Sequence, residues 1–297
     1  MSRRGWILFG TMCVIWGVPY LMIRVAVREL TPATLVFART ALAAALLLPI
    51  AAGRKELRGL LPHWRPLLLF AAVEIGAPWL LLASAEKHLS SSLTGLLIAA
   101  VPLIGAVVAT LTGGDEGLGG RRLAGLLIGL AGVAALVGLD VHGTSVTALG
   151  EIGAVAVGYA VGPLILARRL SDLPSLGVIA VCLAACALAY APLAATELPS
   201  RVPSGRVAAS VVGLAVLCTA LAFVLFFALI AEVGPVRATV ITYLNPAVAA
   251  VLGVSVLGES FTLGMGVGFV LVVTGCALAT RKSSSQATPA ALAVGEP

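Results

Sequence analysis

The chain has 297 residues, of which 60% are hydrophobic and 11% charged, and its mean hydropathy is +1.10. A soluble domain typically has about 25% charged and about 45–50% apolar residues, so this composition excludes an ordinary soluble protein. Runs such as 126–139 and 267–279 are apolar on every face, whereas the strands of a membrane barrel alternate apolar and polar residues. The sequence therefore predicts an all-α integral membrane protein.

Charge and cysteine placement limit the partners further. The net charge is +6, but the basic residues stand singly or in short groups beside apolar runs and form no patch with interleaved aromatic residues. We therefore expect no nucleic-acid partner. The five cysteines lie inside apolar runs without the spacing of a metal site, so we predict reduced structural thiols, no metal and no cofactor.

Apolar windows bounded by charged residues, proline and glycine predict ten membrane-spanning helices. The residues that follow, 283–297, are small and polar and are predicted to form a disordered cytoplasmic tail. The windows are 6–27, 34–52, 66–87, 92–111, 121–139, 146–169, 175–195, 206–229, 237–257 and 262–280.

Orientation follows from the basic residues, because cytoplasmic loops retain Lys and Arg. Placing the N-terminus inside assigns thirteen of them to the cytoplasm and four, Arg28, Lys87, Arg201 and Arg206, to the outside, with Arg24 and Arg39 in the membrane. We therefore expect a multi-pass protein of the cell (inner) membrane with both termini in the cytoplasm. The thirteen are Arg3, Arg4, Arg54, Lys55, Arg58, Arg65, Arg121, Arg122, Arg168, Arg169, Arg237, Arg281 and Lys282.

An internal repeat divides the chain into residues 1–140 and 141–282, with five predicted spans in each part. Prolines recur in the middle of the fourth and ninth spans, 144 residues apart, and a glutamate and two glycines recur at a spacing of 143. An odd number of spans inverts the second half, and inverted repeats are typical of transporters whose halves rock about a site at the midplane. The corresponding pairs are Pro102 and Pro246, Glu116 and Glu259, Gly125 and Gly268, and Gly132 and Gly275.

Pairs of glycines four residues apart predict close helix packing. They are Gly125 and Gly129 in the fifth span, Gly158 and Gly162 in the sixth, and Gly264 and Gly268 in the tenth. Packing within one chain accounts for them, and a homodimer contact is the alternative. The sequence leaves monomer and homodimer open.

Several motifs resemble the EamA family of the drug/metabolite transporter superfamily over nearly the whole chain. They are Trp16-Gly17 in the first span, Pro32 followed by Phe37-Ala38-Arg39 in the second, the two mid-span prolines, and the Gly-Glu corners that lead into glycine-rich spans. The resemblance implies a ten-helix carrier with inverted repeats that exports metabolites or drugs by alternating access. The chain departs from the family pattern at Asp115 and at Glu74 in the third span.

Depth along each span selects the residues of a central cavity. Counting about 1.5 Å per residue from each midpoint places one layer near the midplane, with two polar residues just before the second proline. Each proline frees a carbonyl group one turn earlier, which needs protein or water as a partner. We predict that this set lines a substrate cavity, with helix packing as the alternative: Trp16, Gly17, Tyr20, Trp79, Pro102, Tyr159, Tyr243, Asn245 and Pro246.

Arg39 and Glu74 complete the predicted cavity. A charge at the centre of a spanning helix costs about 2.5–3.5 kcal/mol, so both should face the interior of the bundle. A depth gap of roughly 10 Å between them disfavours a direct ion pair. We predict that Glu74 couples transport to protons, with structural ion pairing as the alternative for both residues. Glu86, Glu151 and Glu232 lie near span ends and are expected to meet water.

The function that these features predict is secondary transport: export of small metabolites, such as amino acids or related amphipathic solutes, or of drugs, with protons as coupling ions. Only one cation, Arg39, belongs to the predicted cavity, which disfavours nucleotide sugars and phosphate esters. The alternatives are a membrane enzyme that acts on a lipid and a facilitative channel. The three histidines lie in loops and no hydrolase or zinc-protease motif is present, so we predict no enzyme activity.

The charge bias makes a topology prediction. In a cysteine-free chain, cysteines at Gly53→Cys and Ser284→Cys should resist an impermeant thiol reagent added to intact cells, and one at Gly143→Cys should react. Labelling at position 284 together with protection at position 143 would overturn the cytoplasmic placement of the termini.

Overall fold

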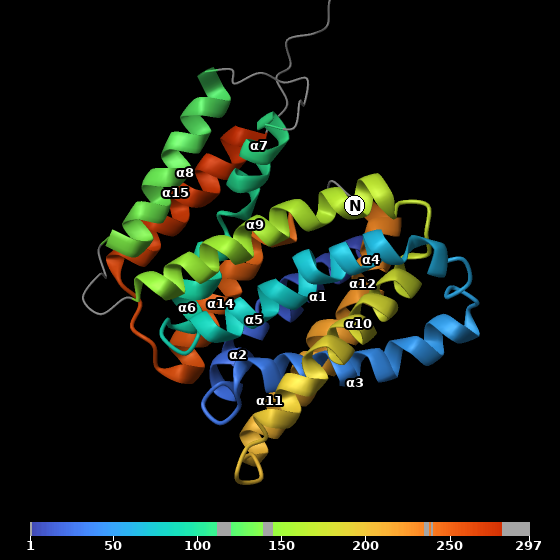
Figure 1. Ribbon diagram of the computed structural model, residues 1–297. Coiled ribbons are helices and arrows are strands. Elements are labelled where there is room, and N and C mark those ends of the chain that lie inside the picture. The colour runs from blue at the N-terminus through green and yellow to red at the C-terminus, as the bar shows by residue number, and fades with distance from the viewer. Residues whose placement is uncertain (1, 112–119, 139–144, 235–237, 239, 281–297) are drawn as a thin grey trace, which may run out of the picture.

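The computed structural model describes residues 2–111, 120–138, 145–234, 238 and 240–280, and every regular element within them is helical (Figure 1). Two short π-helical segments, Ala71–Gly76 and Val216–Leu221, and a 3-10 turn, Leu61–His63, interrupt or precede longer helices. The helices are α1 Arg3–Ile15, α2 Pro19–Ala26, α3 Pro32–Gly53, α4 Trp64–Phe70, α5 Ala77–Ala85, α6 Ser91–Ile98, α7 Val101–Leu111, α8 Gly120–Gly138, α9 Val146–Arg169, α10 Ser175–Thr196, α11 Gly205–Ala215, α12 Ala222–Val233, α14 Ile241–Leu257 and α15 Leu263–Thr280.

Nine helical stretches within the described ranges are long and apolar enough to cross a membrane. Each coincides with one of the ten predicted spans, which confirms a helical membrane protein. The predicted span 237–257 contains α14, an apolar helix of 17 residues that is shorter than these nine, so the tenth span stays a prediction. Glu116, Asp115, the boundary at 140 and the tail 283–297 lie outside the described residues.

Two spans are discontinuous. The first is interrupted at Trp16–Val18, between α1 and α2, and the fourth at Ala99–Ala100, between α6 and α7. Pro102 is the second residue of α7, just after the second interruption. Pro246 does not interrupt its helix: α14 continues through the proline, which donates no backbone hydrogen bond.

The closest helix contacts join the two predicted halves. The antiparallel helices α3 and α10 pack along their length, as do α8 and α15, which lie side by side in Figure 1. The helices α6 and α14, α5 and α9, and the first and eighth predicted spans form further pairs across the halves. The buried core therefore depends on both halves being present.

Glycines bring α8 and α15 into backbone contact. A Cβ atom on Gly132 would lie 2.6 Å from the Val272 nitrogen and 2.8 Å from the Gly268 carbonyl oxygen, and one on Gly268 would lie 2.8 Å from the Gly132 oxygen. Small residues at such positions allow the close approach that holds helices together in lipid. The glycines thus serve packing inside the chain.

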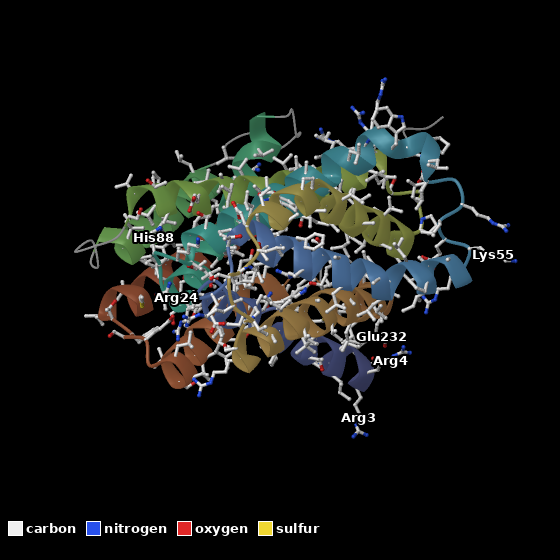
Figure 2. The ribbon with its side chains drawn as sticks, turned by 60° about the horizontal axis from the view of Figure 1, so that its bottom comes forward. Arg3, Arg4, Arg24, Lys55, His88 and Glu232 are labelled. Atoms are coloured by element: carbon white, nitrogen blue, oxygen red, sulfur yellow. The ribbon has the colours of Figure 1, made fainter. Side chains whose placement is uncertain are left out.

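The charged side chains gather at opposite ends of the bundle. Figure 2 shows Arg24 and His88 at one end and Lys55, Arg3, Arg4 and Glu232 at the other. The end that carries Arg3, Arg4 and Lys55 is the one for which the basic residues predict a cytoplasmic location.

A substitution series on helical glycines tests this packing. Gly132→Ala should lower the Tm in detergent by several degrees, because its Cβ meets backbone atoms that cannot move aside. Gly150→Ala on α9, where nothing lies within 4 Å of the added atom, is the control and should leave the Tm unchanged or raise it. Equal behaviour of the two variants would show that the close contact is not needed.

Candidate functional site

Two π-helical segments stand at matching places in the chain. Val216–Leu221 follows Ala71–Gly76 at a spacing of 145 residues, so Glu74 and Thr219 occupy equivalent positions. A π-helical turn inserts an extra residue into a helix and is frequent at functional sites. The Cys186 thiol donates to the Ala71 carbonyl at 3.5 Å and so helps to satisfy the altered backbone.

Arg39 of α3 is the buried cation of the site. Its side chain is 6% exposed, its Nε donates to the Thr219 hydroxyl at 2.9 Å, and its guanidinium carbon lies 3.5 Å from the ring centre of Trp79. A cation over an aromatic face is worth about 2 kcal/mol or more when it is desolvated. The described part of the chain shows no ion pair between Arg39 and a carboxylate, so its partners are a neutral hydroxyl and a ring.

Glu74 is the carboxylate of the site, and its side chain is partly exposed. Its Oε2 is buried and accepts no hydrogen bond within the described ranges. The side chain lies against α9, where a Cβ on Gly162 would come within 2.9 Å of the Glu74 Cδ. One turn earlier, Gly158 gives room to the Val73 carbonyl oxygen, 2.6 Å from its Cβ position. The pair Gly158 and Gly162 therefore seats the π-helical segment.

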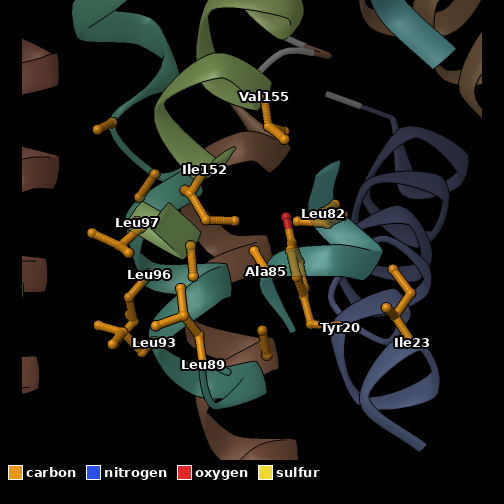
Figure 3. Packing of buried hydrophobic residues seen from close by; sticks show 14 of the residues in the cluster. Tyr20, Ile23, Leu82, Ala85, Leu89, Leu93, Leu96, Leu97, Ile152 and Val155 are labelled. Atoms are coloured by element: carbon orange, nitrogen blue, oxygen red, sulfur yellow. The ribbon is translucent and has the colours of Figure 1, made fainter. Parts of the chain in front are cut away.

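Two tyrosines interact with these charges. Tyr159 of α9 interacts electrostatically with both Glu74 and Arg39 and is within hydrogen-bonding reach of Trp79. Tyr20 of α2 interacts in the same way with Tyr159 and Arg39. Figure 3 shows the Tyr20 ring between α2 and the α5 residues Leu82 and Ala85.

The structure thus brings together five of the predicted cavity residues from four predicted spans: Tyr20, Arg39, Glu74, Trp79 and Tyr159. Arg39, Tyr20 and Trp79 are buried, at 6%, 8% and 8% exposed, whereas Glu74 and Tyr159 are partly exposed. Arg39 and Glu74 make no direct pair, in agreement with their predicted separation in depth. Their role in binding stays a prediction.

A second group of predicted residues lies where the α1–α2 interruption packs against α14. A Cβ on Gly17 would lie 2.5 Å from the Val248 Cβ and 3.0 Å from the Asn245 carbonyl oxygen. The Asn245 amide, oriented so that its nitrogen donates, reaches the Cys13 carbonyl at 3.1 Å and the Ile241 carbonyl at 2.9 Å. These contacts fit the packing alternative for Asn245 and for the neighbouring Pro246.

The remaining predicted residues have other neighbours. Trp16 packs on Phe226 at 4.7 Å and edge-on to Phe223 at 6.1 Å between ring centres. The Tyr243 hydroxyl lies 3.5 Å from the Thr280 hydroxyl of α15. Pro102 is half-buried at the start of α7. Among the described contacts, none joins these three residues to Arg39 or Glu74.

Sequence reasoning missed Thr219 and misplaced Glu86. The repeat spacing of 143 to 144 residues points from Glu74 to Leu217 or Cys218, and only the π-helical segments, 145 residues apart, bring Thr219 into register with Glu74. Glu86 was expected to meet water, which is wrong: it is 0% exposed, and its backbone carbonyl oxygen accepts a hydrogen bond from the Arg24 guanidinium of α2. Glu232 is exposed, as expected, and Glu151 is half-buried, accepting a hydrogen bond from Ser84 at 2.7 Å.

A double-mutant cycle tests whether the site serves solute rather than stability. Thr219→Val should lower the Tm, because it leaves the buried Arg39 Nε without its acceptor at a cost of about 1–3 kcal/mol. The same change should have little effect in an Arg39→Met background, and Arg39→Met alone should raise the Tm by removing a buried charge that lacks a counter-ion. A lower Tm for Arg39→Met would instead identify Arg39 as a structural residue.

Comparisons with known proteins agree with this architecture. The EamA-like transporter family matches residues 3–138 and 150–281. The chain is 31% identical over 291 residues to "Uncharacterized inner membrane transporter YedA" of Escherichia coli strain K12, covering 90% of each chain, and the proteins of that name from strains O6:H1 and O157:H7 match equally. A solved structure titled "Crystal structure of protein" shares the fold with a TM-score of 0.67 and 23% identity, over 94% of this chain and 97% of that one. The chain is therefore a membrane protein of the EamA-like transporter family, within the drug/metabolite transporter superfamily.

Proposed function

We propose that the protein is a secondary transporter that exports small amphipathic solutes, such as amino acids, related metabolites or drugs, across the inner membrane by alternating access coupled to protons. One observation carries the proposal: a buried guanidinium without a carboxylate partner, Arg39, lies in the same part of the bundle as Glu74, which has one buried carboxylate oxygen without a hydrogen-bond partner. Such groups are costly within a membrane and mark substrate and ion pathways. Membership of a transporter family supports the same function.

Alternating access requires two units that can move against each other. In the proposed architecture these are residues 1–140 and 141–282, ten spans in two inverted repeats with both termini cytoplasmic. The π-helical segments at a spacing of 145 residues and the equivalent pairing of α3 with α10 and of α8 with α15 support the repeat. Rocking of such repeats about a fixed site exposes it to one side at a time.

The chemistry of the site favours a solute with one carboxylate. Thr219 accepts a hydrogen bond from the Arg39 Nε, and Trp79 covers one face of the guanidinium group. The geometry of a carboxylate matches the rest of the guanidinium group. Trp79, Tyr20 and Tyr159 offer aromatic surface to an apolar body. A single cation suits a zwitterion or a small amphipathic acid better than a solute with several phosphates.

Glu74 supplies the proposed proton step. A carboxylate that has neither a cation nor a hydrogen-bond donor beside its buried oxygen is stable there only as the neutral acid. When the site opens to water, Glu74 can release its proton. When the site closes, Glu74 must bind a proton again. Each transport cycle would then carry a proton against the solute.

Reconstituted protein tests the coupling. In proteoliposomes screened with an amino-acid and drug panel, Glu74→Gln should abolish accumulation driven by a pH gradient and retain downhill counterflow, because solute binding survives without the proton step. Glu151→Gln is the control carboxylate and should behave as wild type. Gradient-driven accumulation that is unchanged in Glu74→Gln would rule out Glu74 as the coupling site.

A structural role for Glu74 has a different signature. If the carboxylate only supports the fold, Glu74→Gln should lose counterflow and accumulation together. The double change Glu74→Gln with Arg39→Gln should then recover part of the lost flux.

A further inference from the structure

Glu86 is a second buried carboxylate without a partner. It lies directly after α5, is 0% exposed, and neither carboxylate oxygen has a hydrogen-bond partner within the described residues. It belongs to the end of the bundle that carries Arg24, opposite Lys55 and Glu232 (Figure 2). Nothing in the proposed Glu74 step uses it.

A neighbouring carboxylate shows the opposite environment. Glu259, in the turn between α14 and α15, accepts five hydrogen bonds from the backbone nitrogens and hydroxyls of Ser91 and Ser92, at 2.6–3.1 Å. These donors are the start of α6, whose N-terminus favours a negative charge. Glu259 is therefore built to be ionised, and it ties the second half of the chain to the first.

The groups that face Glu86 are Arg24 and Tyr20 from α2 and Glu259 from the α14–α15 turn. The Arg24 guanidinium donates a hydrogen bond to the Glu86 backbone carbonyl oxygen. Burial raises the pKa of Glu86 well above its ordinary value, Arg24 opposes this, and the charge of Glu259 adds to it. Burial acts in the same direction on the pKa of Glu259, but the hydrogen bonds from Ser92 and Ser91 outweigh it and hold that pKa below its usual value.

Two carboxylates at one end of the bundle thus have opposite surroundings: Glu259 accepts five hydrogen bonds, whereas the buried oxygens of Glu86 accept none within the described residues, and such a difference separates an ionised carboxylate from a protonated one. Two tyrosines interact electrostatically with Glu86 and with the central site. Tyr20 interacts with Glu86 on one side and with Tyr159 on the other, and Tyr159 interacts with Glu74. Tyrosine hydroxyls both donate and accept hydrogen bonds.

We propose that Glu86 is a second proton-binding site, which exchanges its proton with the outer solution, while Glu74 exchanges with the cytoplasmic side. When the Arg24 end opens, the O–H bond of the Glu86 carboxylic acid breaks, the proton passes to water, and the carboxylate left behind is stabilised by Arg24. Closure reverses the step. The place of Glu86 in coupling rests on the proposed transport function, whereas its protonation does not.

Infrared spectroscopy of the full-length protein in lipid nanodiscs tests the protonation without any solute. The C=O band of protonated carboxyl groups, identified by its shift in D₂O, should be present at neutral pH and should lose one component in Glu86→Gln. The component should remain in Glu151→Gln, the matched carboxylate control, and in Glu74→Gln. An unchanged band in a folded Glu86→Gln variant would show that Glu86 is ionised and would overturn the proposal.

Proteoliposomes test the position of Glu86 in the proton path. Glu86→Gln should retain counterflow and lose the dependence of accumulation on the pH of the outer side. If Glu74→Gln loses coupling and Glu86→Gln keeps full dependence on the outer pH, the second site is wrong and the transport function stands. If neither variant alters gradient-driven accumulation, proton coupling itself fails, and the infrared result alone decides whether Glu86 binds a proton.

Discussion

A guanidinium group in the middle of a membrane has to find its partners inside the protein, and Arg39 finds a hydroxyl group and an aromatic ring. Thr219 and Trp79 come from the two spans that contain the π-helical segments, one in each predicted half. A single buried cation therefore contacts both halves. A membrane helix rarely keeps such a charge without a function. Under the proposed function, an anionic group of a solute supplies the missing counter-ion.

The rest of the bundle holds this point in place with small residues. Gly158 and Gly162 admit the segment that carries Glu74, and Gly17 admits α14 beside the interruption of the first span. Glycines also bring α8 and α15 into contact. Lipid tails are as apolar as leucine, so helices in a membrane gain little from hydrophobic contact and depend on this close fit.

The sequence predicted the helices well, because a run of apolar residues long enough to cross a bilayer has few other structures available. It also predicted that Arg39 and Glu74 face inward without pairing. It failed where a local signal has two structural outcomes. The two mid-span prolines look alike in the sequence, but Pro102 stands just after an interruption, whereas Pro246 lies within the continuous helix α14, and only the packing of the folded chain decides between these outcomes.

The burial of Glu86 and the role of Thr219 depend on residues far away in the chain. Glu86 lies near the end of a span, which suggested that its side chain meets water. In the structure Glu86 is buried and contacts Arg24, which lies 62 positions earlier in the chain. Thr219 meets Arg39 across 180 positions. Such pairings are set by the tertiary arrangement and leave no periodic trace in the sequence.

Alternating access about the Arg39 layer is the central claim, and distances between spin labels test it most directly. One pair of labels, at the exposed positions Lys87 and Val202, reports on the Arg24 end, and a second pair, at Arg65 and Glu232, reports on the opposite end. In each pair, one label lies in or directly after the span that contains Ala71–Gly76. The other lies in or just before the span that contains Val216–Leu221. The account predicts two distance populations at each end, which shift in opposite directions when pH or a transported solute is varied. A single fixed distance at both ends, or widening of both ends together, would contradict it.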